Sequence, residues 1–168
     1  MKKMSGFTLI ELLVVLSIIV ILSTIVMPNF GPFVQQSRMD SIQNRLLASV
    51  SLARAEAIRQ DVQVTVCARN NTENMANYTC GSNWANGWAV VAGSAAVRVE
   101  DAPANAIAMS GSNITFKSSG LLSSGNDVCF SADDGNGDTD VRYLQVNQFG
   151  RIRAWDGAQN DGVCGSDG

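Results

Sequence analysis

The chain has 168 residues, of which 46% are hydrophobic, and its formal net charge at pH 7 is −3. It contains no histidine, which disfavours histidine-based catalysis and histidine-ligated metal sites. Setting aside an apolar N-terminal segment leaves about 140 residues, which is enough for one globular domain with its own core.

The chain begins with a short basic leader, residues 1–6, which contains Lys2 and Lys3 and no acidic residue. An apolar run follows over residues 7–27, and its length of about 20 residues is what an α-helix needs to cross a bilayer. Lysines before such a run keep that end of the chain in the cytoplasm, so we expect the remainder to be exported. An ordinary signal peptide has a shorter apolar core followed by a small-residue cleavage site. Here the small residue, Gly6, comes before the run.

Glu11 is the only charged residue of the apolar run. A carboxylate inside a membrane span costs roughly 2.5–3.5 kcal/mol, which a plain membrane anchor would not explain. In a helix that begins near Phe7 it lies in the first turn, where the macrodipole favours an anion. We therefore expect Glu11 to have a functional role and a cation as its partner.

The segment Gly6-Phe7-Thr8-Leu9-Ile10-Glu11-Leu12, with the lysines before it and the apolar run after it, resembles the class III signal of type IV pilins and type II secretion pseudopilins. The resemblance implies that a prepilin peptidase cleaves between Gly6 and Phe7 and that the new amine of Phe7 is N-methylated. It also implies that Glu11 pairs with the Phe7 amine of a neighbouring pilin or pseudopilin in a filament. The precursor would cross the inner membrane once with its head in the periplasm, and would then join a pilus at the cell surface or a pseudopilus.

Pro28 follows the apolar run, and a second helical pattern occupies residues 28–60. Proline removes a helical hydrogen bond, so the helix either ends at Pro28 or is kinked there and resumes, and we expect the kink. Apolar residues recur at steps of three and four, which indicates an amphipathic helix packed on a domain core. These residues are Met39, Ile42, Leu46, Val50, Ala53 and Ala57.

The sequence after Gln60 changes to short β-branched segments with period two, separated by Gly, Ser and Asp turns. The expected strands cover residues 62–67, 88–91, 96–100, 114–117, 127–131, 141–147 and 151–155, whereas residues 103–112 are expected to form a loop. Many short strands at this spacing indicate an antiparallel sheet. The expected fold is α+β and pilin-like: a long N-terminal helix, with a membrane half (7–27) and an amphipathic half (28–60), packed on a β-rich head with a polar tail (61–168).

Four cysteines lie on the expected periplasmic side: Cys67, Cys80, Cys129 and Cys164. An even number of cysteines in an oxidising compartment indicates two disulfides, and the absence of any C-x2-C spacing argues against a zinc site. Three connectivities are possible. We favour Cys67–Cys80 with Cys129–Cys164, because each closes a shorter loop than the alternatives.

Five short motifs of the head narrow the resemblance to the GspH/FimT branch of this family. In chain order they are Leu52-Ala-Arg-Ala-Glu-Ala-Ile-Arg59, Asn86-Gly-Trp88, Phe116-x-x-x-Gly120, Cys129-Phe130 and Gly150-Arg-Ile-Arg153. This branch comprises minor pilins of type IV pili and minor pseudopilins of type II secretion, which lie at or near the filament tip and help to start assembly. The sequence does not separate the two systems sharply, and we favour the type IV pilus.

Arg151 and Arg153 are two residues apart on an expected strand and would therefore share one face. Paired guanidinium groups suit phosphate contacts, and the segment resembles the Gly-Arg-x-Arg element of FimT-type minor pilins that bind DNA in natural transformation. The head carries six basic and twelve acidic side chains from Gln60 onward, a net charge of −6 that repels DNA at long range. An exposed or acid-paired strand face is therefore the simpler interpretation, with DNA binding as the alternative.

An aspartate-rich stretch, residues 133–140, is similar to the start of a calcium-binding EF-hand loop. Its oxygen-bearing residues at alternate positions are Asp134, Asn136, Asp138 and Asp140. Thr139 replaces the invariant glycine of that loop and Gln145 its bidentate glutamate, so we expect a solvated turn and no metal. The sequence contains no nucleophile with an adjacent base and no phosphate-binding loop, so we expect neither a cofactor nor enzymatic activity.

Overall fold

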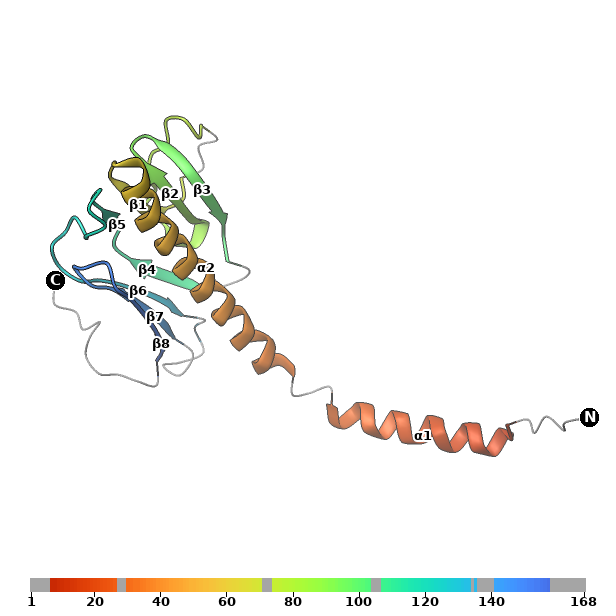
Figure 1. Cartoon of the computed structure of the whole chain (residues 1–168). Coiled ribbons are helices and arrows are strands. Elements are labelled where there is room, and N and C mark those ends of the chain that lie inside the picture. Colours follow the sequence, from red (N-terminus) through yellow and green to blue (C-terminus); the bar gives the residue numbers. More distant parts are fainter. Residues whose placement is uncertain are drawn as a thin grey trace, which may run out of the picture. The chain divides into compact units, whose positions relative to one another are not determined.

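The computed structural model describes residues 7–26, 30–70, 74–103, 107–133, 135 and 141–157 (Figure 1). The chain divides into two compact units, Met1–Gln36 and Ser37–Gly168. The first contains helix α1 (Leu9–Val26) and the start of helix α2 (Phe30–Gln60), and the second contains the rest of α2 and all eight strands that the described residues form.

Helix α1 is apolar on every side, and its large apolar side chains from Leu9 to Leu22 are 45–81% exposed. Within the described ranges, no helix combines the length and the apolarity that crossing a membrane requires. The expected kink at Pro28 lies outside the described residues, and helical structure is present again from Phe30.

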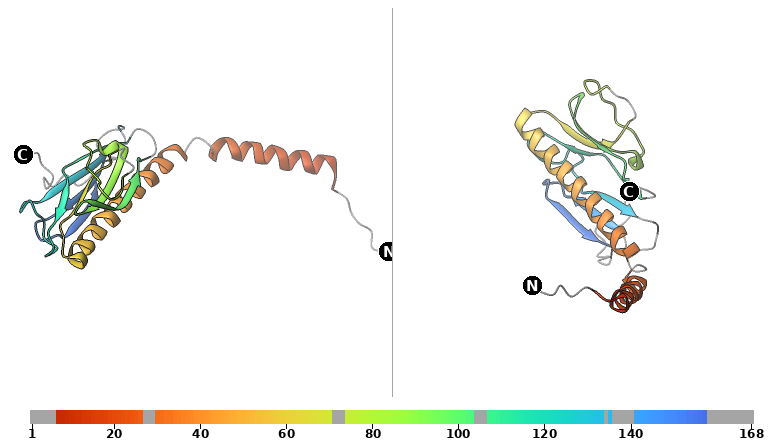
Figure 2. Two further views of the ribbon diagram at one scale, coloured as in Figure 1. Left: turned by 90° about the horizontal axis from the view of Figure 1, so that it is seen from above. Right: turned by 90° about the vertical axis from the view of Figure 1, so that its right-hand side faces the viewer.

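The head is built on the amphipathic part of α2. The apolar stripe predicted from the sequence is confirmed, because all six of its residues are at most 3% exposed. They pack into one continuous core with the strands of both sheets. Figure 2 shows the ribbon of α2 running along the strands of the head. A single helical face therefore covers two separate sheets, and its burial contributes roughly 0.8 kcal/mol for each buried methylene group.

The strands form two antiparallel four-stranded sheets. The first has the order β3-β2-β1-β5, with β1 (Val64–Ala68), β2 (Gly87–Ala92), β3 (Ala95–Asp101) and β5 (Ile114–Phe116). The second has the order β4-β6-β7-β8, with β4 (Ala108–Gly111), β6 (Val128–Asp133), β7 (Arg142–Val146) and β8 (Ile152–Asp156). A short 3-10 helix, η2 (Trp84–Asn86), leads into β2. The α+β class with an antiparallel head is therefore confirmed.

Strand β4 corrects one expectation, because residues 103–112 were predicted to form a loop. Its sequence, Ala-Met-Ser-Gly, lacks the β-branched residues that mark a strand. Pairing with β6 in the tertiary structure makes it a strand, with Ala108 opposite Asp133 and Gly111 opposite Phe130. A Cβ atom at Gly111 would lie 2.3 Å from the Phe130 ring, so the strand approaches its neighbour too closely for a larger residue.

The core is centred on aromatic residues. Trp88 is fully buried on β2, and its Nε1 donates a hydrogen bond of 2.9 Å to Ser49 Oγ on α2. The Arg45 guanidinium lies 5.2 Å from the centroid of the Trp88 ring. Trp84 of η2 packs edge-to-face on Phe130 of β6, with 4.7 Å between the ring centroids. Helix and aromatic contacts thus join the first sheet to the second.

The outer face of the first sheet carries a smaller apolar cluster formed by Cys67, Tyr78, Ala89 and Val91. A disulfide between Cys67 and Cys80, the first of the two pairs expected from the sequence, holds the segment before η2 over this face. Tyr78 N donates to Ser94 O at 2.8 Å and Gly81 N to Ala68 O at 2.9 Å. The disulfide and these backbone bonds allow a polar loop to cover buried strand residues.

Candidate functional site

The N-terminal turn of α1 positions Glu11. Thr8 Oγ1 accepts a hydrogen bond of 3.3 Å from Glu11 N, and Thr8 O accepts one of 3.2 Å from Leu12 N. Thr8 is therefore the N-cap of α1, and Glu11 occupies the third helical position of a Thr-x-x-Glu capping sequence. The Phe7 side chain is exposed, and Gly6 lies outside the described residues. This geometry holds a carboxylate close to the mature N-terminus that the class III signal implies.

The hairpin that joins β7 to β8 positions the two candidate arginines. Asn147 Oδ1 accepts hydrogen bonds from Arg151 N at 2.9 Å and from Phe149 N at 3.1 Å. Asn147 N donates to Arg151 O at 3.0 Å, which closes the turn. Gln145 lies opposite Arg153 in the β7–β8 register. Hydrogen bonds between Asn147 and the backbone of Phe149 and Arg151 therefore fix the conformation of this turn.

Arg151 and Arg153 are exposed, as an interaction surface requires. Three other arginines of the head are neutralised: Arg69 pairs with Asp101, Arg98 with Glu100 and Arg142 with Asp40. Neither Arg151 nor Arg153 forms an ion pair in the part of the chain that the structure describes. The acid-paired strand face considered from the sequence is therefore not found among these residues.

Glu100 illustrates how the paired cations act on their partners. Burial disfavours its charged form, but hydrogen bonds from Arg45 and Arg98 outweigh that effect and lower the pKa of Glu100 below its ordinary value. Glu100 therefore remains an anion at neutral pH. The guanidinium groups of Arg45 and Arg98 are engaged in this ion-pair network, whereas those of Arg151 and Arg153 are not.

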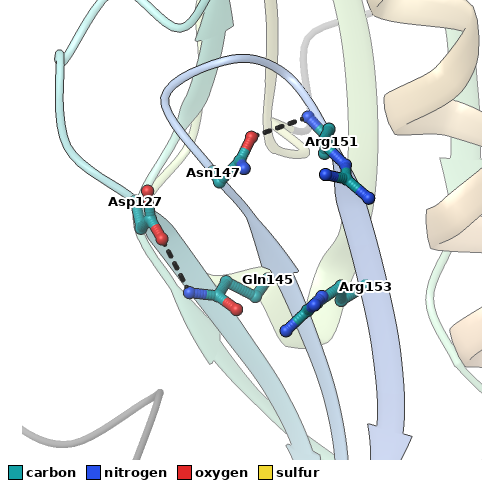
Figure 3. A pocket seen from close by; sticks show the side chains of 5 residues that line it. All are labelled: Asp127, Gln145, Asn147, Arg151 and Arg153. Atoms are coloured by element: carbon teal, nitrogen blue, oxygen red, sulfur yellow. Dashed lines mark hydrogen bonds between the residues drawn. The ribbon is translucent and has the colours of Figure 1, made fainter.

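A pocket of about 270 Å³ lies beside the two arginines (Figure 3). Its lining residues are Asp127, Gln145, Asn147, Arg151 and Arg153. Gln145 Nε2 donates to Asp127 Oδ2 at 2.8 Å, and Gln148 N donates to Asp127 Oδ1 at 3.0 Å. Figure 3 shows Asp127 across the pocket from the arginines, so the cavity has a cationic side and an anionic side.

Arg54 of α2 holds the hairpin turn in place. Its Nη1 donates to Gly150 O at 2.9 Å, its Nη2 to Phe149 O at 3.2 Å, and its Nε to Gly120 O at 3.1 Å. Both glycines have positive φ angles, +75° at Gly120 and +74° at Gly150. A Cβ atom at Gly150 would lie 2.6 Å from Gly120 O, so the two turns are too close for any other residue. One guanidinium thus connects three of the sequence motifs.

Sequence reasoning identified Arg151 and Arg153, but it did not predict the residues around them. Arg54 could have been singled out from the sequence, because it lies in the motif of residues 52–59 but does not belong to the apolar stripe. Asp127 and Asn147 were expected only as the first and last residues of two strands, and the strand register brings them to the pocket. Thr8 could have been found from its spacing to Glu11, which is that of a capping sequence.

Two further sequence-based expectations concern residues that are only partly described. Cys129 is disulfide-bonded, whereas Cys164, its expected partner, lies outside the described residues. All four candidate calcium-ligand positions between Asp134 and Asp140 also lie outside them. Among the residues that are described, no group of three or more carboxylate or cysteine side chains could hold a metal ion.

Comparison with known proteins identifies the family of the chain. Residues 1–27 match the prokaryotic N-terminal methylation motif, and residues 43–150 match the family described as type II transport protein GspH. No curated protein matches the chain.

The structure is similar to two crystal structures of the type IV minor pilin FimU from Pseudomonas aeruginosa. In space group P21 the identity is 19% and the TM-score 0.56, over 79% of this chain and 96% of FimU. In space group P65 the identity is 20% and the TM-score 0.54, over 74% and 94%. The pilin fold, the GspH match over most of the head and the methylation motif agree, and the chain belongs to the GspH family of minor pilins and pseudopilins.

Proposed function

We propose that this chain is a minor pilin that lies at or near the tip of a type IV pilus and helps to start its assembly. The observation that carries the proposal is the combination of a methylation motif, an apolar helix with exposed side chains and a GspH-type head in one chain. An apolar helix of this kind requires either lipid or neighbouring helices around it, because exposed apolar surface is unfavourable in water. A filament core of packed helices provides such surroundings.

The maturation route that we propose begins in the inner membrane. The apolar stretch 7–27 would hold the precursor there, with the head in the periplasm, until prepilin peptidase removes residues 1–6 and the Phe7 amine is methylated. The methylated amine remains a cation and can neutralise Glu11 of a neighbouring pilin. Periplasmic folding is consistent with the Cys67–Cys80 disulfide, because disulfides persist in oxidising compartments.

Deletion of the gene tests the proposed system. For a type IV pilus subunit, we expect the deletion to reduce the number of surface pili and leave the secretion of type II substrates unchanged. The family description, type II transport protein, favours the alternative of a secretion pseudopilin. The opposite result, normal pilus numbers with lost secretion, would establish that alternative and exclude the type IV pilus.

Processing provides a direct prediction. Mass spectrometry of the chain purified from its native membrane should show a mature N-terminus at Phe7 that carries one methyl group. Gly6→Ala should lower the processed fraction, because the peptidase requires a small, flexible residue before the cleaved bond. A conservative change outside the leader, such as Leu9→Ile, should leave processing intact. A mature chain that begins at Met1, or after Met27, would contradict the proposed maturation.

We also propose that the head binds DNA through Arg151 and Arg153. Support comes from two exposed guanidinium groups that have no carboxylate partner among the described residues, on a hairpin that Arg54 and Asn147 hold rigidly. Guanidinium groups contact phosphates well, and a rigid backbone reduces the entropy lost on binding. The acidic remainder of the head limits the affinity, so binding should be weak and independent of sequence.

Replacing both arginines, Arg151→Gln with Arg153→Gln, should abolish binding of the detergent-solubilised full chain to duplex DNA. Fluorescence anisotropy at several salt concentrations measures this affinity, and the wild-type slope against salt should be small because few phosphates are contacted. The melting temperature should change little, since substitutions at exposed positions usually alter stability by less than about 0.5 kcal/mol.

The double variant Arg38→Gln with Lys117→Gln is a matched control, because it removes the same charge from exposed positions, and neither residue forms an ion pair within the described part of the chain. It should retain most of the binding. Equal losses in both double variants would show that net charge alone governs binding and would contradict a specific role of the hairpin. Absence of wild-type binding even at low salt, where attraction is least screened, would rule out DNA binding.

A further inference from the structure

We propose that the pocket beside the β7–β8 hairpin binds one unpaired nucleotide of a DNA strand. The phosphate would lie between Arg151 and Arg153, and the base would face Gln145, Asn147 and Asp127. This inference rests on the DNA-binding function proposed above and specifies the form of DNA that the site prefers.

The size of the pocket favours a single nucleotide unit. Its volume of about 270 Å³ is close to the lower end, about 300 Å³, of pockets that bind small molecules. A duplex presents its phosphates on a convex outer surface and needs only exposed cations to bind them. The concave shape and the amide side chains that line this pocket have no use in such a contact. They do suit a group that enters the cavity.

Asp127 supplies the strongest argument. A carboxylate repels phosphate, so a site for phosphate alone would not be expected to contain one. Each Asp127 oxygen accepts one hydrogen bond, from Gln145 Nε2 at 2.8 Å and from Gln148 N at 3.0 Å. An ionised carboxylate has about four lone-pair sites, so it can accept further hydrogen bonds. The N–H groups of a nucleobase are suitable donors, and carboxylates accept from them in known base contacts.

Phe149 adds an aromatic surface on the same turn. Its side chain is 59% exposed, two residues from both Asn147 and Arg151. Its backbone is held on both sides, by the bonds from Phe149 N to Asn147 Oδ1 and from Arg54 Nη2 to Phe149 O. Exposed aromatic rings beside cations stack on unpaired bases, whereas bases within a duplex are already stacked on each other. The ring therefore favours single-stranded DNA as well.

The proposal is tested by measuring how tightly the full chain in detergent binds three labelled DNA ligands of equal length. These are a single strand, the same strand with abasic sites throughout, and the duplex. The abasic strand keeps the phosphates and lacks the bases. We expect the wild-type chain to bind the base-bearing strand at least about tenfold more tightly than the abasic strand, the size of effect that base contacts and stacking produce. The duplex should also bind more weakly than the base-bearing strand.

Asp127→Asn distinguishes a pocket that binds a base from a surface that binds phosphates only, because the two predict opposite changes in the affinity for the base-bearing strand. If Asp127 accepts from a base, the variant should bind the base-bearing strand about tenfold more weakly and the abasic strand more tightly, because a negative charge near phosphate is removed. If only phosphates bind, the variant should bind both strands more tightly, which would overturn the pocket proposal.

Phe149→Ala provides a second variant, because the Phe149 side chain is largely exposed and its loss should not unfold the head. It should weaken binding of the base-bearing strand about fivefold or more and leave the abasic strand unchanged. Phe149→Tyr, which keeps an aromatic ring, should restore most of the affinity. Equal wild-type affinities for base-bearing and abasic strands would overturn the nucleotide pocket and leave the arginine–phosphate contacts in place. No binding to any of the three ligands would overturn the DNA function itself.

Discussion

Trp88→Ala should destabilise the head by about 3–5 kcal/mol, the usual cost of truncating a buried aromatic side chain to alanine. Trp88 is fully buried between β2 and α2, and the variant also removes the Nε1 hydrogen bond to Ser49. Domains of this size are stable by only about 5–15 kcal/mol, so a large part of the total would be lost. Urea unfolding of the detergent-solubilised chain, followed by circular dichroism, measures the free energy of unfolding.

Trp155 offers a matched control for this prediction. It stacks on Tyr143 with 5.7 Å between the ring centroids, but it is only partly buried. Trp155→Ala should therefore cost much less, about 0.5–1.5 kcal/mol for the aromatic pair with a modest addition for lost burial. Equal costs for the two tryptophan variants would contradict the role of Trp88 as the centre of the core.

Glu11→Ala should nearly abolish incorporation of the chain into filaments, which is the largest functional effect that we expect. The variant should still enter the membrane normally, because it removes a group that is unfavourable in a bilayer by roughly 2.5–3.5 kcal/mol. Within a filament, the methylated Phe7 amine of a neighbouring pilin would lose its counter-charge. Immunoblotting of sheared filaments against the membrane fraction separates these two steps.

Glu11→Gln and Glu11→Asp refine the test. Gln keeps the shape of the side chain without its charge and should fail as alanine does, whereas Asp keeps the charge and should retain part of the incorporation. Thr8→Ala removes the helix cap, which costs about 0.5–2 kcal/mol, and serves as a control for simple loss of helix stability. Normal filament content in Glu11→Ala would contradict a role for the carboxylate in assembly.

The strand pattern shows where local sequence is sufficient and where it is not. Segments such as Val64–Ala68 alternate and are β-branched, so their extended conformation follows from their own side chains. Ala108–Gly111 has no such preference, and pairing with β6 alone makes it a strand. The division into two sheets was likewise not predicted. Strand partners are chosen by contacts between residues far apart in the chain, and periodicity does not record those contacts.

The candidate site shows the same difference. Arg151 and Arg153 were recognisable because their spacing of two places them on one face of a strand. Arg54 lies 96 residues from Gly150 and 66 from Gly120, and hydrogen bonds over such separations leave no local pattern. The pocket also depends on Asp127, which only the β6–β7 and β7–β8 pairings bring near the arginines.

The sequence by itself determined the class III signal motif, the amphipathic helix of the head and the pilin family, because each depends on residue types at short, regular spacings. Only the tertiary structure decided which cations lack an acidic partner among the described residues, which turns meet at Arg54 and where a cavity forms. Those features depend on the packing of two sheets against one helix. Packing is set by the combined shape and charge of many distant side chains, so no single stretch of the sequence contains it.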